Sequence, residues 1–248
     1  MPEVTTSLLS AKQIPAQERL IFALDVPSAD EARQMVETMG DSVHFYKLGL
    51  ELFMAGGYFE LIEWLNQRGK KVFADLKFYD VPQTVESAVR QLAQHEGVTF
   101  ATVHAADSLL TAACRAKQHL NILAVTVLTS LDQGDLNDLG FQADVKQIVL
   151  SRARRALELG CDGVISSGLE APELRQQLDE QLLIITPGIR PVQNTDDQKR
   201  TVNVEQAFRN GADYIVVGRP IKEHYGFDTP RAAALSIQQR ITTLFNPS

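Results

Sequence analysis

Short apolar segments rich in β-branched residues recur along the chain, and longer stretches with helical periodicity separate most of them. The segments are continuously apolar rather than alternating, which is typical of parallel strands buried on both faces. We predict one β-strand in each of eight segments: Arg19–Val26, Val43–Leu50, Lys71–Phe78, Val98–His104, Asn121–Leu128, Asp162–Ser167, Leu182–Ile189 and Ala212–Arg219.

The stretches between these strands carry the signals of amphipathic helices. In Gln147–Leu159, apolar residues recur at helical spacing among arginines and a glutamate. Ser28 and Asp30 supply capping residues for a helix over Glu31–Met39. Glycines close several of these patterns, as is typical of the residue that follows a helix: Gly40, Gly69, Gly97, Gly160 and Gly211.

Eight strand–helix units in 248 residues predict an α/β protein with a single-domain (β/α)8 TIM barrel. The active site of such a barrel lies at the C-terminal ends of its strands. A doubly wound open sheet is the alternative, although it usually has fewer strands. We assign residues 18–248 to the barrel and residues 1–17 to a flexible, polar N-terminal arm.

Composition narrows the classes of partner and the compartment. The net charge of −7 argues against broad binding of nucleic acids or anionic membranes. The two cysteines lie far apart in the sequence, and we interpret them as small core residues of a protein from a reducing, cytoplasmic setting. No apolar run approaches the roughly 18 residues of a membrane span, and the first residues do not resemble a signal peptide.

Charged residues stand near the C-terminal ends of the first three predicted strands. They are Asp25, Lys47, Asp75 and Lys77, and the last two share a face because they are two residues apart. A buried strand tolerates a charge only with a partner, so we expect all four to converge at the barrel mouth. For each residue alone, a salt bridge that merely closes the barrel is an equal alternative, whereas the cluster as a whole favours a functional site.

Asp80 adds a third charge to the pair formed by Asp75 and Lys77, and it precedes Pro82 at the expected entry to a helix. A lysine between two carboxylates is biased towards its protonated form. We therefore predict that Lys77 is an ammonium able to donate a proton to a developing carbanion. The histidines and cysteines show no metal-ligand spacing, so we predict no bound metal.

The loops after the seventh and eighth strands carry a possible phosphate site. Each contains a glycine close to an arginine: Gly188 with Arg190, and Gly218 with Arg219. Backbone N–H groups at such glycines and a guanidinium fork suit phosphate oxygens, although tight turns and solvated arginines would explain the same residues. The polar stretch from Arg190 to about Asn203 is long for a connection, and we predict a lid or binding loop there.

Three further residues are weaker candidates. His104 ends the fourth strand and is either a base or, more often for such a residue, a core histidine. Thr129 and Ser130 follow the fifth strand and either bind a ligand or make a turn.

The sequence resembles the orotidine 5′-phosphate decarboxylase family along nearly its whole length. The most specific shared motif is the run from Asp75 to Thr84, which contains Asp75, Lys77, Asp80, Pro82 and Thr84. The other shared motifs follow in the family's order: Asp25 in ALDV, Lys47 in YKLG, Val127-Leu128-Thr129-Ser130, Pro187-Gly188-Ile189-Arg190-Pro191, Asp197-Gln198 and Gly218-Arg219-Pro220.

The resemblance implies conversion of orotidine monophosphate to uridine monophosphate (UMP), the last step of de novo pyrimidine synthesis, without a metal or an organic cofactor. It also implies a homodimer in which Asp80 and Thr84 enter the partner's site. Lys77 matches the lysine that protonates C6, and Asp75 matches the aspartate near the substrate carboxylate.

Further site residues are implied by the same resemblance. Asp25 and Lys47 match residues that contact the ribose, and Thr129 and Ser130 fall where the pyrimidine is held. The phosphate would be bound by Gln198, Gly218 and Arg219, with Arg190 at another ligand-binding position.

Two alternative functions remain open. A magnesium-dependent sugar-phosphate decarboxylase of the 3-keto-L-gulonate 6-phosphate type resembles this chain in the Asp-x-Lys-x-x-Asp motif and the phosphate loops. Its second strand carries a glutamate ligand two residues before a glycine, where this chain has Lys47 before Gly49. A non-catalytic barrel that binds nucleotide phosphate is the other alternative, and the intact Asp75, Lys77 and Asp80 argue against it.

Overall fold

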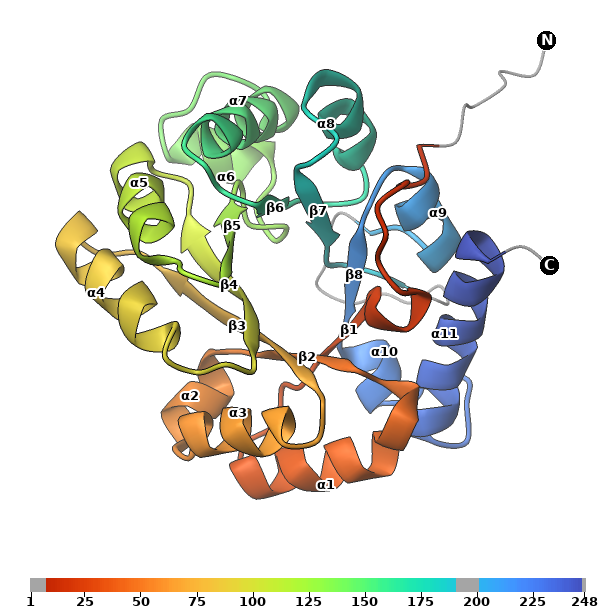
Figure 1. Ribbon diagram of the computed structural model, residues 1–248. Coiled ribbons are helices and arrows are strands. Elements are labelled where there is room, and N and C mark those ends of the chain that lie inside the picture. The colour runs from red at the N-terminus through yellow and green to blue at the C-terminus, as the bar shows by residue number, and fades with distance from the viewer. Residues whose placement is uncertain (1–7, 191–200, 247–248) are drawn as a thin grey trace, which may run out of the picture.

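The computed structural model describes residues 8–190 and 201–246, and eight parallel strands close into a barrel in chain order (Figure 1). Each strand is hydrogen-bonded to the next, and β8 pairs with β1. This confirms the predicted (β/α)8 barrel. The strands are β1 Leu20–Ala23, β2 Phe45–Leu48, β3 Lys71–Phe78, β4 Val98–His104, β5 Asn121–Val125, β6 Gly163–Ile165, β7 Leu183–Thr186 and β8 Tyr214–Val217.

Helices surround the barrel on its outside (Figure 1). Two short 3-10 helices, η1 Ala16–Glu18 and η2 Gly40–Ser42, precede β1 and β2. The α-helices are α1 Ala29–Met39, α2 Leu50–Ala55, α3 Tyr58–Asn66, α4 Pro82–Leu92, α5 Asp107–Ala116, α6 Gln133–Asp138, α7 Val145–Glu158, α8 Ala171–Gln177, α9 Val204–Arg209, α10 Arg219–Lys222 and α11 Pro230–Phe245.

Two strands, β3 and β4, have the predicted bounds, and the other six are shorter than the apolar segments that predicted them. β5 ends at Val125 rather than Leu128, and β7 ends at Thr186 rather than Ile189. Beyond both ends the chain leaves the barrel sheet. Val127, Leu128, Pro187 and Gly188 line a cavity at the barrel mouth, and Ile189 forms an isolated bridge with Val202. The apolar segment therefore includes the strand and part of the loop that builds the site.

Helix ends follow the predicted signals with one exception. The Ser28 hydroxyl accepts a hydrogen bond from the Glu31 N–H at 3.2 Å, which caps α1. Four of the five helix-closing glycines have a positive φ: Gly40, Gly69, Gly160 and Gly211. Gly97 does not have a positive φ, so the prediction that it closes a helix is wrong. A Cβ at Gly97 would lie 2.7 Å from the Cβ of Asn66, so close packing requires glycine there.

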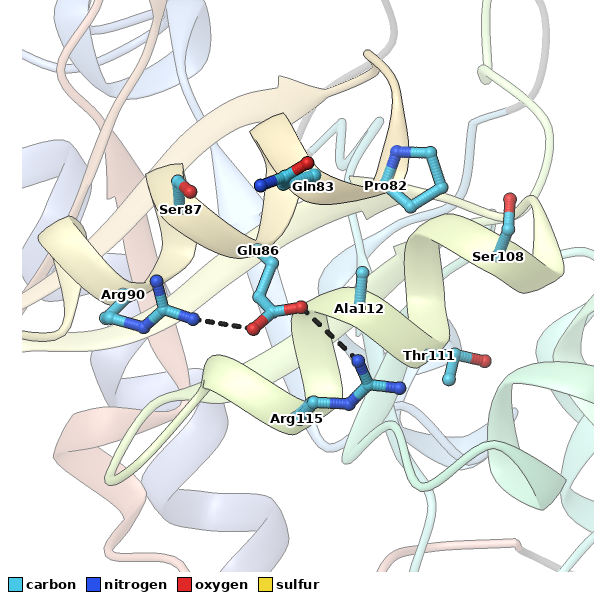
Figure 2. A pocket seen from close by; sticks show the side chains of 9 residues that line it. All are labelled: Pro82, Gln83, Glu86, Ser87, Arg90, Ser108, Thr111, Ala112 and Arg115. Carbon is cyan, nitrogen blue, oxygen red and sulfur yellow. Dashed lines mark hydrogen bonds and ion pairs between the residues drawn. The ribbon is translucent and has the colours of Figure 1, made fainter.

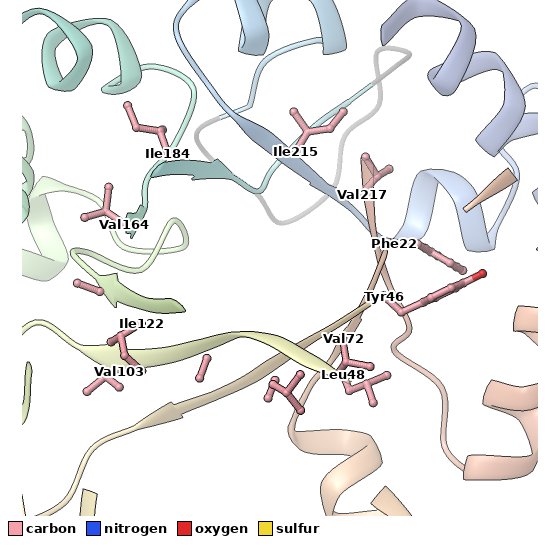
Figure 3. Close-up of a cluster of buried hydrophobic side chains, with 14 of the residues drawn as sticks. Phe22, Tyr46, Leu48, Val72, Val103, Ile122, Val164, Ile184, Ile215 and Val217 are labelled. Atoms are coloured by element: carbon pink, nitrogen blue, oxygen red, sulfur yellow. The ribbon is translucent and has the colours of Figure 1, made fainter. Parts of the chain in front are cut away.

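Alternate residues of each strand point to opposite sides, which divides the core into two parts. The part between the sheet and the helices is shown in Figure 3, with Phe22, Tyr46, Ile184 and Ile215 among its members. Residues pointing inward fill the barrel itself: Ile21, Ala23, Phe45, Phe73, Phe100, Leu123, Ile185, Tyr214 and Val216. The barrel is thus packed below its mouth rather than open as a pore.

Residues 8–17 of the predicted arm are bonded to the amino-terminal end of the barrel, and residues 1–7 lie outside the described residues. The Leu8 N–H donates to the Arg209 carbonyl at 3.0 Å. The Lys12 ammonium lies 3.1 Å from the fully buried carboxylate of Asp213, which also pairs with Arg175 at 2.8 Å. These bonds seal the end opposite the mouth.

Candidate active site

Four charged residues from three adjacent strands meet at the barrel mouth. Lys47 lies in β2 beside Ala23 of β1 and Phe73 of β3 in the sheet register, and Asp25 follows β1 by two residues. Asp75 and Lys77 lie near the end of β3. All four line one cavity of about 230 Å³, as predicted from their places in the sequence.

The four side chains form one chain of alternating charges. The Lys47 ammonium lies 3.3 Å from Asp25 Oδ1 and 3.4 Å from Asp75 Oδ2. The Lys77 ammonium lies 2.8 Å from Asp75 Oδ1. Asp75 therefore holds both lysines, one on each carboxylate oxygen, and the order along the mouth is Asp25, Lys47, Asp75, Lys77.

Burial and charge act in opposite directions on this network. Burial favours the neutral form of Asp75, but the ammonium groups of Lys47 and Lys77 outweigh it and lower the pKa of this carboxyl. Burial likewise favours neutral Lys47, and the carboxylates of Asp75 and Asp25 outweigh it and raise its pKa. Both residues are therefore ionised at neutral pH.

The backbone of Lys77 has an unusual conformation, with a φ of 48° in the left-handed region. Such a conformation is costly for a residue with a side chain and is found at functional sites. The register between β3 and β4 shifts between Ala74 and Phe78, so Lys77 sits at a bulge in the sheet. The bulge sets the direction of the Lys77 side chain.

Thr102 of β4 holds this bulge, and the sequence pattern did not indicate it. Its hydroxyl is fully buried, accepts the Lys77 N–H at 3.0 Å and donates to Asp75 Oδ1 at 3.0 Å. One hydroxyl thus fixes both members of the Asp75–Lys77 pair. A threonine inside an apolar strand gives little local signal, since threonine is common in strands.

Asp80 does not join the charged network within one chain. Its carboxylate accepts a hydrogen bond from the Val81 N–H at 2.6 Å, and among the described residues no ion pair links it to Lys77. Within one chain Lys77 therefore does not lie between two carboxylates, since Asp80 turns towards the entry of α4. Asp80 and Thr84 are both exposed at the surface of the described chain.

The candidate phosphate-binding residues lie in different places around the barrel mouth. Gly188 has a φ of 76° and lines the cavity with Pro187. Gly218 precedes α10, and a Cβ there would lie 3.7 Å from Asp25 Oδ2, so this loop reaches the charged cluster. Arg219 is the first residue of α10, and Arg190 Nη1 donates to the Ile189 carbonyl at 3.0 Å. Gln198 and Asp197 lie outside the described residues.

The three weaker candidates, His104, Thr129 and Ser130, differ in whether they line the cavity. Thr129 lines the cavity, whereas Ser130 is exposed and is not part of its lining. His104 ends β4, and its ring centroid lies 5.1 Å from that of Tyr79. Burial and then the nearby charges of Lys77 and Arg152 lower the pKa of His104, which keeps it neutral at pH 7.

Most of the remaining lining of the cavity is apolar. Its wall is formed by side chains that point into the barrel: Ala23, Phe73, Val125, Ile165 and Val216. Charges beside such a wall interact more strongly than charges in water. The cavity therefore combines a charged side, formed by β1 to β3, with an apolar side.

A larger cavity of about 580 Å³ lies between α4 and α5 on the outside of the barrel (Figure 2). There the Glu86 carboxylate accepts from Arg90 at 2.6 Å and lies 3.5 Å from Arg115. It has neither the buried lysine–aspartate network nor the strained backbone found at the mouth. Chemistry rather than size thus identifies the mouth as the site.

The mouth is poorly suited to a metal ion. In residues 8–190 and 201–246, no three His, Cys, Asp or Glu side chains are grouped so that they can hold one. The place between the carboxylates of Asp25 and Asp75 is taken by the Lys47 ammonium. A cation in the ligand shell of Mg²⁺ would repel it.

Residues 18–237 match the model of the orotidine 5′-phosphate decarboxylase / HUMPS family. The chain belongs to this family. The orotidine 5′-phosphate decarboxylase of Methylococcus capsulatus is 60% identical over 96% of this chain and 98% of its own length. The enzyme of the same name from Nitrobacter winogradskyi is 46% identical over 94% of this chain and 96% of its own length.

Solved structures of the family are similar in fold. The orotidine 5′-phosphate decarboxylase of Lactobacillus acidophilus is 34% identical, with a TM-score of 0.79 over 90% of this chain and 99% of that chain. The enzyme of the same name from Pyrococcus horikoshii is 26% identical, with a TM-score of 0.71 over 90% and 98%. These matches confirm the family that the motifs predicted. In the described part of the chain, no helix is long and apolar enough to span a membrane.

Proposed function

We propose that the protein decarboxylates orotidine 5′-phosphate to UMP and CO2 in the cytoplasm, without a metal or organic cofactor. The observation that carries the proposal is the buried alternation of Asp25, Lys47, Asp75 and Lys77 at the mouth of a barrel of this family. This step completes de novo UMP synthesis.

The two sides of the cavity suit the two kinds of group in this substrate. The pyrimidine packs against the apolar wall near Thr129 and Ser130, and the ribose hydroxyls bond to Asp25 and Lys47. The phosphate binds at Gly218 and Arg219, with Gln198 and Arg190 as further ligands. The phosphate oxygens are negatively charged and accept hydrogen bonds from the backbone N–H groups of a glycine loop and from a guanidinium.

The reaction leaves an electron pair on C6 in the plane of the ring, where the π system does not delocalise it. The Lys77 ammonium stabilises this charge electrostatically and then donates its proton to C6. Asp75 holds the ammonium at 2.8 Å, and Lys47 on the other side of Asp75 keeps that carboxylate ionised. The charges are already in place before substrate binds, so little reorganisation is needed.

The complete site is composite in this proposal. Asp80 and Thr84 are exposed beside the mouth and are not bonded to the Lys77 cluster of their own chain. In a symmetric dimer each protomer offers the same patch to the other. Asp80 and Thr84 then complete the partner's site.

An assay in chelator tests the reaction and the absence of a metal together. After dialysis against EDTA, the protein is expected to consume orotidine monophosphate at the same rate as the undialysed protein. The loss of orotidine monophosphate absorbance measures this rate. Activity lost in EDTA and restored by Mg²⁺ would favour the sugar-phosphate decarboxylase alternative. Absence of turnover with tight UMP binding would favour a non-catalytic barrel.

Replacement of Thr102 by valine is expected to lower kcat about 10-fold to 100-fold with little change in KM. Valine keeps the shape but leaves the Lys77 N–H without its partner and removes one of the two hydrogen bonds to Asp75 Oδ1, at a cost of about 1–3 kcal/mol. Steady-state kinetics measures the effect. Thr102→Ser is the matched control, since it keeps the hydroxyl and should retain most of the activity. Equal kinetics for Thr102→Val and the unaltered protein would contradict the positioning role.

A further inference from the structure

The two cysteines meet at the end of the barrel opposite the mouth. Cys114 lies in the last turn of α5, and Cys161 lies two residues before β6. They are 47 positions apart in the sequence, yet their sulfur atoms are 3.5 Å apart, and both are free thiols. Both pack in or against the core, as predicted, but their separation in the sequence did not indicate that they touch.

The backbone on both sides of this pair is fastened by one lysine. Lys117, which follows α5, donates to the Gly160 carbonyl at 2.9 Å and to Asp162 Oδ1 at 2.8 Å. Gly160 and Asp162 are the two neighbours of Cys161. Asp162 Oδ2 in turn accepts the Ile122 N–H of β5 at 2.8 Å. The segments that carry the two thiols are thus held together independently of the sulfur atoms.

We propose that Cys114 and Cys161 form a reversible dithiol–disulfide site that is oxidised by hydroperoxides. A contact of 3.5 Å between sulfurs leaves only a small approach to the roughly 2.05 Å of a disulfide bond. Cys114 is partly exposed and can meet the oxidant, whereas Cys161 is 5% exposed and lies behind it. Cys114 is the thiol that reacts first, and Cys161 resolves it.

The electrostatics of the pair agree with these two roles. A hydrogen bond from Cys161 lowers the pKa of the Cys114 thiol, and although burial opposes this, the Lys117 ammonium lowers it further. The same hydrogen bond, with burial, raises the pKa of Cys161. Once Cys114 has been oxidised it is no longer a thiolate that accepts the Cys161 proton in a hydrogen bond. The main cause of the raised pKa of Cys161 is then removed.

The reaction balances with a hydroperoxide as the sole oxidant. The Cys114 thiolate attacks one peroxide oxygen; an S–O bond forms, the O–O bond breaks, and the other oxygen leaves as an alcohol or water after taking up a proton. The Cys161 sulfur then attacks the Cys114 sulfenic sulfur. The S–S bond forms, the S–O bond breaks, and water leaves with the Cys161 proton. Two electrons pass from the thiols to the peroxide, and a dithiol reductant returns them.

Treatment of the purified protein with equimolar hydrogen peroxide tests the site. The expected product is an intact monomeric chain lighter by two hydrogen atoms, with a Cys114–Cys161 linked peptide after non-reducing digestion. Alkylation in denaturant should then find no free thiol, and dithiothreitol should restore both. Cys161→Ser is the matched control, in which Cys114 should stop at a sulfenic acid that dimedone traps.

Three results would overturn the proposal. The first is two alkylatable thiols after peroxide treatment. The second is a disulfide that joins two chains, visible on a non-reducing gel. The third is irreversible oxidation of Cys114 to the sulfinic acid in the unaltered protein, which would mean that Cys161 does not reach it before further oxidation.

A second measurement separates this site from the reaction at the mouth. The crosslink joins positions 47 apart in the sequence and restricts the unfolded chain, so the Tm of the oxidised protein should exceed that of the reduced protein. Decarboxylation should be unchanged, because the pair lies at the opposite end of the barrel. A lower Tm after oxidation would contradict the preset geometry, and the outcome does not depend on which reaction the mouth performs.

Discussion

A Lys77→Ala variant is expected to lose at least about 10⁴-fold in kcat, since general acid catalysis contributes roughly 10²–10⁴-fold and a preorganised charge about 10²–10³-fold. Lys77 is the only lysine of the network held by Asp75 alone, at 2.8 Å, whereas Lys47 is shared with Asp25. Its ammonium is therefore the one that can leave its carboxylate and face the substrate. Single-turnover and steady-state assays measure the loss.

The control for this variant lies at the other end of the same strand. Lys71 begins β3 and pairs with Glu18 at 2.6 Å, far from the mouth. Lys71→Ala removes an equal charge and should leave kcat within about twofold, because Lys71 lies at the opposite end of β3 from the cavity. The fold should also persist, because a surface ion pair contributes only about 0–1 kcal/mol to stability. Lys77→Ala should still fold and bind UMP by calorimetry. Near-normal turnover of Lys77→Ala would reject this lysine as the proton donor.

Mixing two inactive variants is expected to restore activity. In a heterodimer of Lys77→Ala and Asp80→Ala subunits, one site carries both changes and the other carries neither, if each site takes Asp80 from the partner. Random exchange makes about half of the dimers heterodimeric, and each has one intact site of two, so about a quarter of the unaltered activity should return. The rate of orotidine monophosphate loss after subunit exchange measures it.

The matched control exchanges one variant for another from the same network. Asp75 and Lys77 contact each other within one chain, so a mixture of Asp75→Ala and Lys77→Ala subunits leaves no intact site. This mixture should stay inactive under the same exchange. No recovery with Asp80→Ala after demonstrated exchange, or equal recovery in both mixtures, would refute the shared site.

The positions of the strands and of four charged residues follow from the sequence alone. Buried parallel strands are continuously apolar, so each of the eight segments is visible without tertiary information. A charge can end such a segment only where it can leave the core, and this requirement places Asp25, Lys47, Asp75 and Lys77 at the mouth. The structure confirms these placements.

The ends of the strands are less well determined. Val127 and Ile189 continue the apolar pattern after the strand has ended, because parts of the loops over the mouth are also buried. Hydrophobicity reports burial, and it does not report whether a neighbouring strand supplies hydrogen bonds. The exact boundary therefore depends on the length of the adjacent strand.

Only the tertiary structure decided two contacts between distant residues and the direction of one carboxylate. Thr102 reaches Lys77 because β3 bulges against β4, Asp80 turns from Lys77 because it enters α4, and Cys114 meets Cys161 across 47 positions. The sequence periodicity states which face of its own element a side chain occupies. It does not state the register, the bulge or the helix position that brings two such faces together, and these arise only when the whole barrel has closed.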